Sequence, residues 1–334
     1  MTLLLRLVRF AFGSGALGIS LLAILALLGF AVPALDVLNH LQVVLFAGTL
    51  VSLVAIAPLM GRGNWRRFVL AATATGLLAS AVTVVPEAIA AFAPRPPVPT
   101  DGRTVVKMMT HNLFGMNYDM QRVADVVFAE DPDILALQEY FGQQSSALGP
   151  LLHARYPYSA YCHGGKRANI ALYSKIPFTQ TQDNACPENA YGHQRTAHIL
   201  AKFTLADGTT FSVLTTHLDW PAPKIMRQEE QFASLRDTIL NTPGPLVVAG
   251  DFNSTSWSYT QRNFAREAKL RRETHAVMTF PMRFWILGWR DTWPPFLPLD
   301  QVMTRDLTVH DLHSGPRTGS DHLPIIFTFS VPKT

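Results

Sequence analysis

Polar side chains follow most of the apolar, strand-like runs of this sequence, and their types are those that hold cations and phosphates. The sharpest case is LVVAGDFN, residues 246–253, where an apolar β-branched run reaches Gly250 and then presents Asp251 and Asn253. This run predicts a buried strand with an acid and an amide at its end, where α/β sheets place ligand chemistry. Asp and Asn are also ordinary turn formers, so their weight depends on partners elsewhere.

Such partners occur along the chain. Strand-like runs also end on Asn112, Glu139, His217 with Asp219, Asp300, and Asp321 with His322. One ending of this kind is a turn residue, but six on separate runs indicate a site. Hydrolysis of a phosphoester needs neutralised phosphate oxygens, a deprotonated water and a stabilised leaving oxygen, and these residue types supply all three.

The expected cofactor is Mg²⁺, or Mn²⁺ in its place. Magnesium prefers oxygen ligands and keeps several waters, so one or two carboxylates are enough to hold it. Glu139 is the first expected ligand, followed by Asn112 and Asp321. A zinc site is disfavoured, because the chain has two cysteines and its histidines do not fall at zinc-like spacing.

The mixture of strands and helices favours an α/β sandwich over a barrel of strict βα repeats. Helices are predicted at 120–130, 224–240 and 259–270. Strands are predicted at 104–113, 134–137, 169–173, 196–204, 211–218, 246–249, 299–303 and 323–329.

The ordered motifs HNL, LQEY, NIALYS, TTHLD, GDFNS, LDQV and GSDHLP resemble those of the endonuclease/exonuclease/phosphatase superfamily. The resemblance covers residues 104–331. It implies a four-layer α/β sandwich, with two mixed β-sheets packed together and helices on both outer faces. It also implies a metal-dependent phosphoric ester hydrolase.

The resemblance gives the polar residues specific roles. Asp251 is expected to orient or deprotonate the attacking water, and Asn253 to hold a phosphate oxygen. His322 is expected to contact the phosphate while Asp300 holds its other ring nitrogen. His217 matches a histidine that contacts the phosphate or the leaving group.

The resemblance also bears on other positions. Asn169 matches a phosphate-side asparagine, whereas Lys166 and Arg167 are either phosphate-binding or solvated loop charges. Asp219 is expected to be a surface turn residue. Gln301 stands where many members have Tyr or His. The stretch FPMRFWILGWRDTWPPFLP, residues 280–298, is either core cover or an aromatic lip that meets lipid or stacks a base.

Three uncharged runs, 10–35, 37–61 and 68–86, precede this region. A transmembrane helix needs about 20 apolar residues, so three membrane helices are expected. A signal peptide would account only for the first run. Basic residues lie before the first span and between the second and third, which predicts a cytoplasmic amino terminus and a periplasmic catalytic domain on a multi-pass inner-membrane protein.

The expected domains are an anchor at 1–93, a Pro-rich linker at 94–102 and a catalytic domain at 103–334. Six of the 28 basic and two of the 24 acidic residues lie in 1–99, so the rest of the chain carries 22 of each. This balance disfavours nucleic-acid binding, which usually needs a basic surplus. Cys162 and Cys186 either form a disulfide or remain two thiols.

The leading hypothesis is therefore a membrane-anchored, metal-dependent phosphoesterase. Its substrate would be a phosphodiester or phosphomonoester, with a lipid head group or another small phosphoester modestly favoured. An extracytoplasmic nuclease is the alternative, and a non-catalytic membrane receptor is the alternative of another class. No obligatory protein partner is evident from the sequence.

Overall fold

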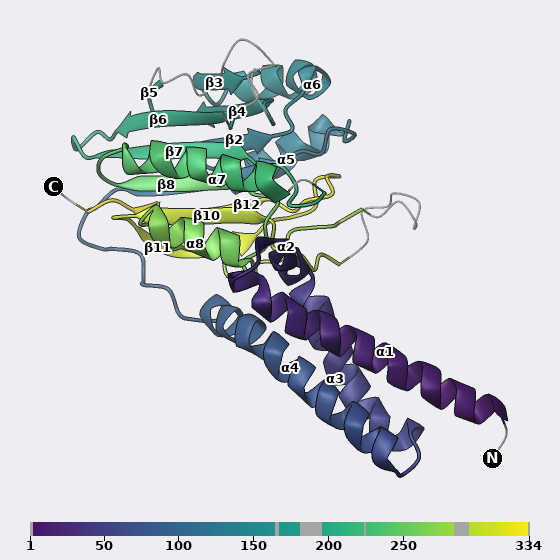
Figure 1. Ribbon diagram of the computed structural model, residues 1–334. Helices are drawn as coiled ribbons and strands as arrows, with labels where there is room; N and C mark the ends of the chain where they lie inside the picture. The colour runs from purple at the N-terminus through teal and green to yellow at the C-terminus, as the bar shows by residue number, and fades with distance from the viewer. Residues whose placement is uncertain (1–2, 164–166, 181–195, 224, 284–293, 333–334) are drawn as a thin grey trace. The chain divides into compact units, whose positions relative to one another are not determined.

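The structure, a computed structural model of the chain, describes residues 3–163, 167–180, 196–223, 225–283 and 294–332 (Figure 1). It divides into two compact units. The helical unit comprises Met1–Phe92 with Trp257–Arg262, and the sandwich unit comprises Ala93–Ser256 with Asn263–Thr334.

The helical unit contains three long helices, α1 (Leu3–Leu27), α3 (Gln42–Leu59) and α4 (Asn64–Ala91). Short turns join the first two: η1 (Leu28–Phe30), α2 (Pro33–Asp36) and η2 (Val37–Leu41). Small residues let the helices approach closely, since a Cβ added at Gly76 would lie 2.7 Å from the Cα of Ser20. Three stretches, Leu3–Phe30, Pro33–Leu59 and Asn64–Ala91, are long and apolar enough to cross a membrane.

Two six-stranded mixed sheets form the sandwich unit. The first sheet has the order β11-β12-β1-β2-β4-β3 and the second β5-β6-β7-β8-β10-β9. The first sheet's strands are β1 (Val105–Asn112), β2 (Ile134–Gln138), β3 (Tyr158–Cys162), β4 (Ile170–Ser174), β11 (Thr308–Ser314) and β12 (Ile325–Ser330). The second sheet's strands are β5 (Phe178–Gln180), β6 (His198–Thr204), β7 (Thr210–His217), β8 (Leu246–Asp251), β9 (Arg271–Arg272) and β10 (Asp300–Arg305).

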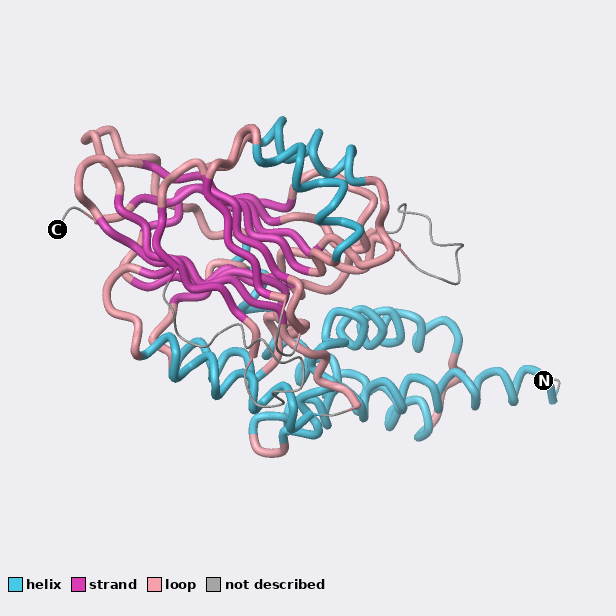
Figure 2. Tube along the Cα trace, turned by 90° about the horizontal axis from the view of Figure 1, so that it is seen from above, coloured by secondary structure: helices cyan, strands magenta, loops and turns pink. Residues whose placement is uncertain are grey.

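The layers are held by three buried apolar clusters. Inward-facing side chains of both sheets, such as Met108, Phe203 and Phe327, form the middle cluster. Helices α5 (Met120–Glu130) and α6 (Gly142–His153) cover the first sheet, while α7 (Ile225–Leu240) and the later residues of α8 (Tyr259–Glu267) cover the second. In Figure 2 the strands run together in magenta with helices outside them. The expected four-layer sandwich is confirmed.

The strand register gathers the polar strand ends at one edge. β1 and β2 are parallel, with Asn112 opposite Gln138, and β7 and β8 are parallel, with His217 opposite Asp251. β10 is antiparallel to β8 and starts with Asp300 opposite Asp251. We call the edge where β1, β2, β7 and β8 end and β10 begins the site edge, and the opposite one the far edge.

Gly250 is required for this arrangement. Its φ is +151°, and an added Cβ would lie 2.0 Å from the carbonyl oxygen of Thr216 on the neighbouring strand. Gly250→Ala is therefore expected to destabilise the protein by about 3 kcal/mol, measured by thermal unfolding in detergent. Gly142→Ala is the matched control, because nothing lies within 4 Å of its added Cβ. Equal unfolding temperatures for the two variants would contradict this prediction.

Candidate active site

The centre of the site edge is the carboxylate of Asp251, which is fully buried. Asn112 Nδ2 donates to Asp251 Oδ2 at 2.8 Å and to Glu139 Oε1 at 3.4 Å. His217 Nε2 lies 3.4 Å from Asp251 Oδ2 and 3.9 Å from Glu139 Oε1. The ends of β1, β2, β7 and β8 thus bring together the residues that the sequence predicted would meet.

Local backbone geometry aims these side chains. Glu139 and Asn253 adopt left-handed conformations, with φ of 55° and 46°, directly after their strands. The Asn253 N–H donates to Asp251 Oδ1 at 2.8 Å, and the Gly115 N–H donates to Glu139 Oε2 at 2.7 Å. Both carboxylates are therefore fixed by backbone donors and keep one oxygen facing the centre.

His322 and Asp300 form the expected pair. The ring Nδ1 of His322 lies 2.7 Å from Asp300 Oδ2, and its Nε2 lies 3.8 Å from Asp251 Oδ2. Burial lowers the pKa of His322, but the charges of Asp300 and Asp251 outweigh burial and raise it to about 10. His322 is therefore a charged donor at neutral pH, with Nε2 turned towards the centre of the site.

The pKa values of His217 and Asp251, the other two titratable groups at the centre, shift in opposite directions. Burial lowers the pKa of His217, which keeps its ring neutral at neutral pH. Burial also raises the pKa of the Asp251 carboxyl, and the nearby charge of Asp300 adds to this effect although His322 opposes it. A carboxylate with a raised pKa is a stronger base than an exposed one, which suits the acceptance of a proton from water.

Oxygen ligands for a cation are present on one side of the centre. The pKa of Asp321 is raised to about 6, mainly by burial; the charges of Glu139 and Asp251 contribute to this rise, while His322 opposes it. Such mutual repulsion among carboxylates is relieved by a divalent cation, and oxygen donors are those that Mg²⁺ prefers. Glu139 and Asp321 therefore fit the cofactor.

Asn112 fits a ligand role less directly. Its side-chain oxygen accepts the Phe114 N–H at 2.9 Å, and its amide nitrogen faces the two carboxylates. Asp251, Asp300 and His322 also offer atoms within 4.8 Å of one another. Because His322 is already hydrogen-bonded to Asp300, this trio is better suited to proton and charge handling than to binding a cation.

The predicted substrate-binding residues lie next to this centre. The Asn169 carbonyl accepts the Tyr140 N–H at 2.7 Å, so Asn169 lies beside the residue that follows Glu139. Arg167 Nε donates to Asp219 Oδ1 at 2.8 Å. Asp219 is only 14% exposed in its side chain, so the expectation of a surface turn residue was wrong. Lys166 lies outside the described residues.

Asn253 is hydrogen-bonded to the end of β7. Its Nδ2 donates to the Leu218 carbonyl at 2.8 Å and lies 3.3 Å from His217 Nε2, while its Oδ1 is buried without a hydrogen-bond partner. The amide group thus joins the ends of β7 and β8.

Several residues that support the site were missed by sequence reasoning. The Ser320 hydroxyl donates to the Asn112 carbonyl at 2.7 Å and accepts the His322 N–H at 3.0 Å. The Phe280 ring lies 4.9 Å from the His322 ring, centroid to centroid. The Gly-Ser-Asp-His order carried a signal for Ser320, but nothing in the sequence placed Phe280 against His322.

Gln301, which follows Asp300, is hydrogen-bonded to the loop after β8. Gln301 Nε2 donates to the Ser254 and Pro298 carbonyls at 3.1 and 2.7 Å, and its Oε1 accepts from Thr274 at 2.7 Å. This departure from the usual Tyr or His therefore fixes the loop after β8.

Of the aromatic stretch 280–298, residues 284–293 lie outside the described part. Cys162 is disulfide-bonded, and Cys186 lies outside the described part as well.

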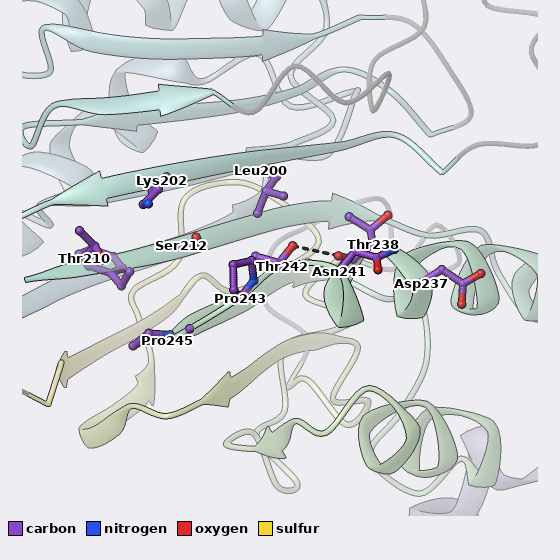
Figure 3. Close-up of a pocket in the computed structure, with 12 residues that line it drawn as sticks. Leu200, Lys202, Thr210, Ser212, Asp237, Thr238, Asn241, Thr242, Pro243 and Pro245 are labelled. Atoms are coloured by element: carbon purple, nitrogen blue, oxygen red, sulfur yellow. Dashed lines mark hydrogen bonds between the residues drawn. The ribbon is translucent and has the colours of Figure 1, made fainter. Parts of the chain in front are cut away.

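A cavity of about 500 Å³ lies elsewhere in the sandwich unit (Figure 3). It is lined by residues of β6, β7 and the end of α7, including Lys202, Ser212 and Thr238. Pro245, just before β8 begins, also lines it, which places it towards the far edge. None of the predicted site residues lines this cavity.

Comparison with known proteins identifies the family. A UPF0294 protein of Vibrio cholerae is 32% identical over 133 residues, which are 40% of this chain and 44% of that protein. The match therefore spans less than half of the relative's length. An endonuclease/exonuclease/phosphatase from Bacteroides vulgatus has a TM-score of 0.54 at 18% identity and covers 69% of this chain and all of its own. One from Beutenbergia cavernae has a TM-score of 0.52 at 20% identity, covering 69% of this chain and 72% of its own. These structures share the fold, and since the sequence profile of the Endonuclease/Exonuclease/phosphatase family matches residues 109–322, the chain belongs to that family.

Proposed function

We propose that this protein is a membrane-anchored, metal-dependent phosphoesterase. It hydrolyses a phosphodiester or phosphomonoester, and a lipid head group or another small phosphoester is the favoured substrate. The observation that carries the proposal is the arrangement around Asp251. A buried base lies within 4 Å of two histidine rings, one of which Asp300 keeps charged, beside the acidic side chains of Glu139 and Asp321.

Each residue has a chemical task in this proposal. Asp251 orients the attacking water and takes its proton. His322 donates from Nε2 to a phosphate oxygen and stabilises the charge that develops there, because Asp300 holds its Nδ1. His217, whose Nε2 lies 3.4 Å from Asp251 Oδ2, contacts the phosphate or the leaving group.

Other residues bind rather than react. Glu139 and Asp321, with Asn112 beside them, would hold Mg²⁺ or Mn²⁺, which supplies neutralisation of the phosphate charge when bound. Asn253 fixes the end of β8, and the N–H of its Nδ2 that faces His217 Nε2 at 3.3 Å is the one that would donate to a phosphate oxygen. Asn169 and Arg167 lie on the substrate side, where Arg167 adds positive charge if it leaves Asp219.

We also propose the membrane topology expected from the sequence. The anchor, 1–93, spans the inner membrane three times, and the linker, 94–102, leads to a periplasmic catalytic domain, 103–334. The disulfide of Cys162 supports an oxidising compartment. A reporter fused after Thr100 is expected to give a periplasmic signal; a cytoplasmic signal would overturn this orientation.

The function is tested with the full chain in detergent and a generic substrate, bis(4-nitrophenyl) phosphate. Hydrolysis is expected to stop with a chelator and to return with Mg²⁺ or Mn²⁺. Glu139→Gln is expected to raise the Mg²⁺ concentration for half-maximal rate by at least about tenfold. A rate indifferent to chelator would contradict the metal assignment.

A substrate panel then separates the candidate functions. Phospholipids in mixed micelles and plasmid DNA are supplied to the same preparation. Preferred turnover of lipid supports the proposal, and preferred turnover of DNA supports the nuclease. No turnover of any phosphoester, together with an unchanged phenotype of the Asp251→Ala/Glu139→Gln variant, would favour a receptor.

A further inference from the structure

Exposed apolar side chains collect on the loops of the site edge. Among the residues that the structure describes, five protrude there: Met116, Tyr118, Phe141, Trp220 and Met226, with exposed fractions of 52, 67, 41, 39 and 68%. They follow β1, β2 and β7 or begin α7, and all of these elements meet at the site edge. We call these five residues the apolar rim. Large exposed apolar groups gathered around a site indicate an interaction surface.

The apolar rim touches the site on two sides. A Cβ added at Gly115 would lie 2.8 Å from the Phe141 ring, and the Gly115 N–H holds Glu139. The Trp220 ring lies 5.6 Å from Phe280, whose ring lies 4.9 Å from that of His322. Whatever covers Phe141 and Trp220 therefore also lies next to Glu139 and His322.

The linker limits how far this unit can be from a membrane. Arg95 donates to the Glu273 carboxylate at 3.0 Å and to its carbonyl at 2.7 Å, and the Pro96 carbonyl lies 3.1 Å from His310 Nδ1. Only residues 92–94 remain between the end of α4 and this attachment. That stretch spans no more than about 15 Å, so the attachment point stays close to the end of an apolar helix.

The attachment lies along β10 and β11 and not at the site edge. The Glu273 carboxylate accepts from the Thr304 hydroxyl at 2.6 Å, and His310 Nε2 lies 2.8 Å from Oγ of Ser330, which pairs with Val105 at the start of β1. The short tether thus limits the distance of the whole sandwich unit, the rim included, from the end of α4.

We propose that the apolar rim inserts into the head-group region of the bilayer, so that the site acts on phosphoesters of lipids in that membrane. This proposal rests on the proposed phosphoesterase function and names its substrate class. Insertion of apolar side chains at the interface gives binding in proportion to the area buried. Stacking on single-stranded nucleic acid fits less well, because it uses aromatic side chains along a basic groove. Two rim residues are methionines, and the region from residue 100 onward carries equal numbers of basic and acidic residues.

Insertion can be measured without turnover. Met226 and Leu240 lie at opposite ends of α7, near the site edge and the far edge respectively, and both are exposed. A cysteine at either position is labelled with an environment-sensitive fluorophore in the full chain, reconstituted in nanodiscs with a chelator present and without reductant. Quenching by doxyl-labelled phosphatidylcholine is expected to be at least about twofold stronger at 226 than at 240.

Equal quenching at the two positions overturns the insertion of the rim. Protection of the label at 226 by an oligonucleotide, without quenching by the lipid, overturns it in favour of a nucleic-acid surface. Both outcomes are independent of catalysis, so they are distinguishable from failure of the proposed function.

Matched double variants test the consequence for catalysis. Met226→Ser/Tyr118→Ser removes two rim residues, and Leu240→Ser/Tyr158→Ser removes a similar pair at the far edge. The rim variant is expected to hydrolyse bilayer phospholipid about tenfold more slowly than the control. Both are expected to hydrolyse bis(4-nitrophenyl) phosphate within about twofold of the unmodified protein, because surface changes rarely disturb a fold.

A rim variant that retains full lipid turnover overturns the proposal. So does an equal loss by both variants on lipid, since the effect would then not belong to the site edge.

Discussion

The Asp251→Asn variant is expected to hydrolyse bis(4-nitrophenyl) phosphate about 10³-fold more slowly than the unmodified protein at neutral pH. The amide keeps the shape of the carboxylate and one acceptor, so the strand end at β8 remains in place. What it loses is the ability to take a proton from water. The measurement is kcat with saturating Mg²⁺, so that weaker metal binding does not contribute.

The thermal unfolding temperature distinguishes a loss of catalysis from a loss of folded protein. Burial raises the pKa of Asp251, which means that its ionised form is disfavoured in the folded protein. A neutral side chain at 251 relieves this cost but leaves Asn112 Nδ2 without its acceptor, so the thermal unfolding temperature is expected to fall by no more than about 5 °C. Asp311→Asn, at a carboxylate that is 58% exposed, is the control and should leave both quantities unchanged. A loss of only a few-fold at 251 would assign the proton to another group, such as His217.

The parts of the fold that sequence predicts well are those in which local pattern and burial agree. β1, β7 and β8 are fully or nearly fully buried runs rich in β-branched residues, and each was expected within a residue or two of its bounds. α5, expected at 120–130, buries Val123 and Val127 on the face that packs on the first sheet. Such segments fold as their periodicity indicates because packing and propensity favour the same structure.

Elements were missed where these signals conflict. α6 contains Gly149 and Pro150 and has a weakly amphipathic sequence, yet it is helical because Leu148 and Leu152 pack on the first sheet. β3, with the sequence YSAYC, and β11 are edge strands that alternate incompletely. Tertiary packing and strand pairing decide these segments, and neither can be read from a short local pattern.

The site shows the same division. The pairing of Asp300 with His322 was expected from the resemblance of the ordered motifs to the superfamily, and the structure has this contact at 2.7 Å. The ion pair of Arg167 with Asp219 joins loops 52 residues apart, and the orientation of the Asn112 amide depends on rotamers. The contact of Phe280 with His322 depends on a loop whose course has no sequence signature. These features follow from three-dimensional geometry.

The Asp300→Asn variant is expected to lower kcat about 10²-fold and to move the alkaline limb of its pH profile to lower pH. His322 is charged below its pKa, which Asp300 and Asp251 raise from 6.5 to about 10 against the effect of burial. Activity that needs this charge is present at neutral pH and is lost as pH rises through the folded-state pKa. Burial lowers the pKa of His322, and without the charge of Asp300 less remains to oppose this effect. The pKa of His322 therefore falls, and activity is lost from a lower pH onward. The measurement is kcat against pH at saturating Mg²⁺, with Asp311→Asn as the control. An unchanged alkaline limb would show that Asp300 only orients the ring, and that the charge of His322 is maintained by Asp251.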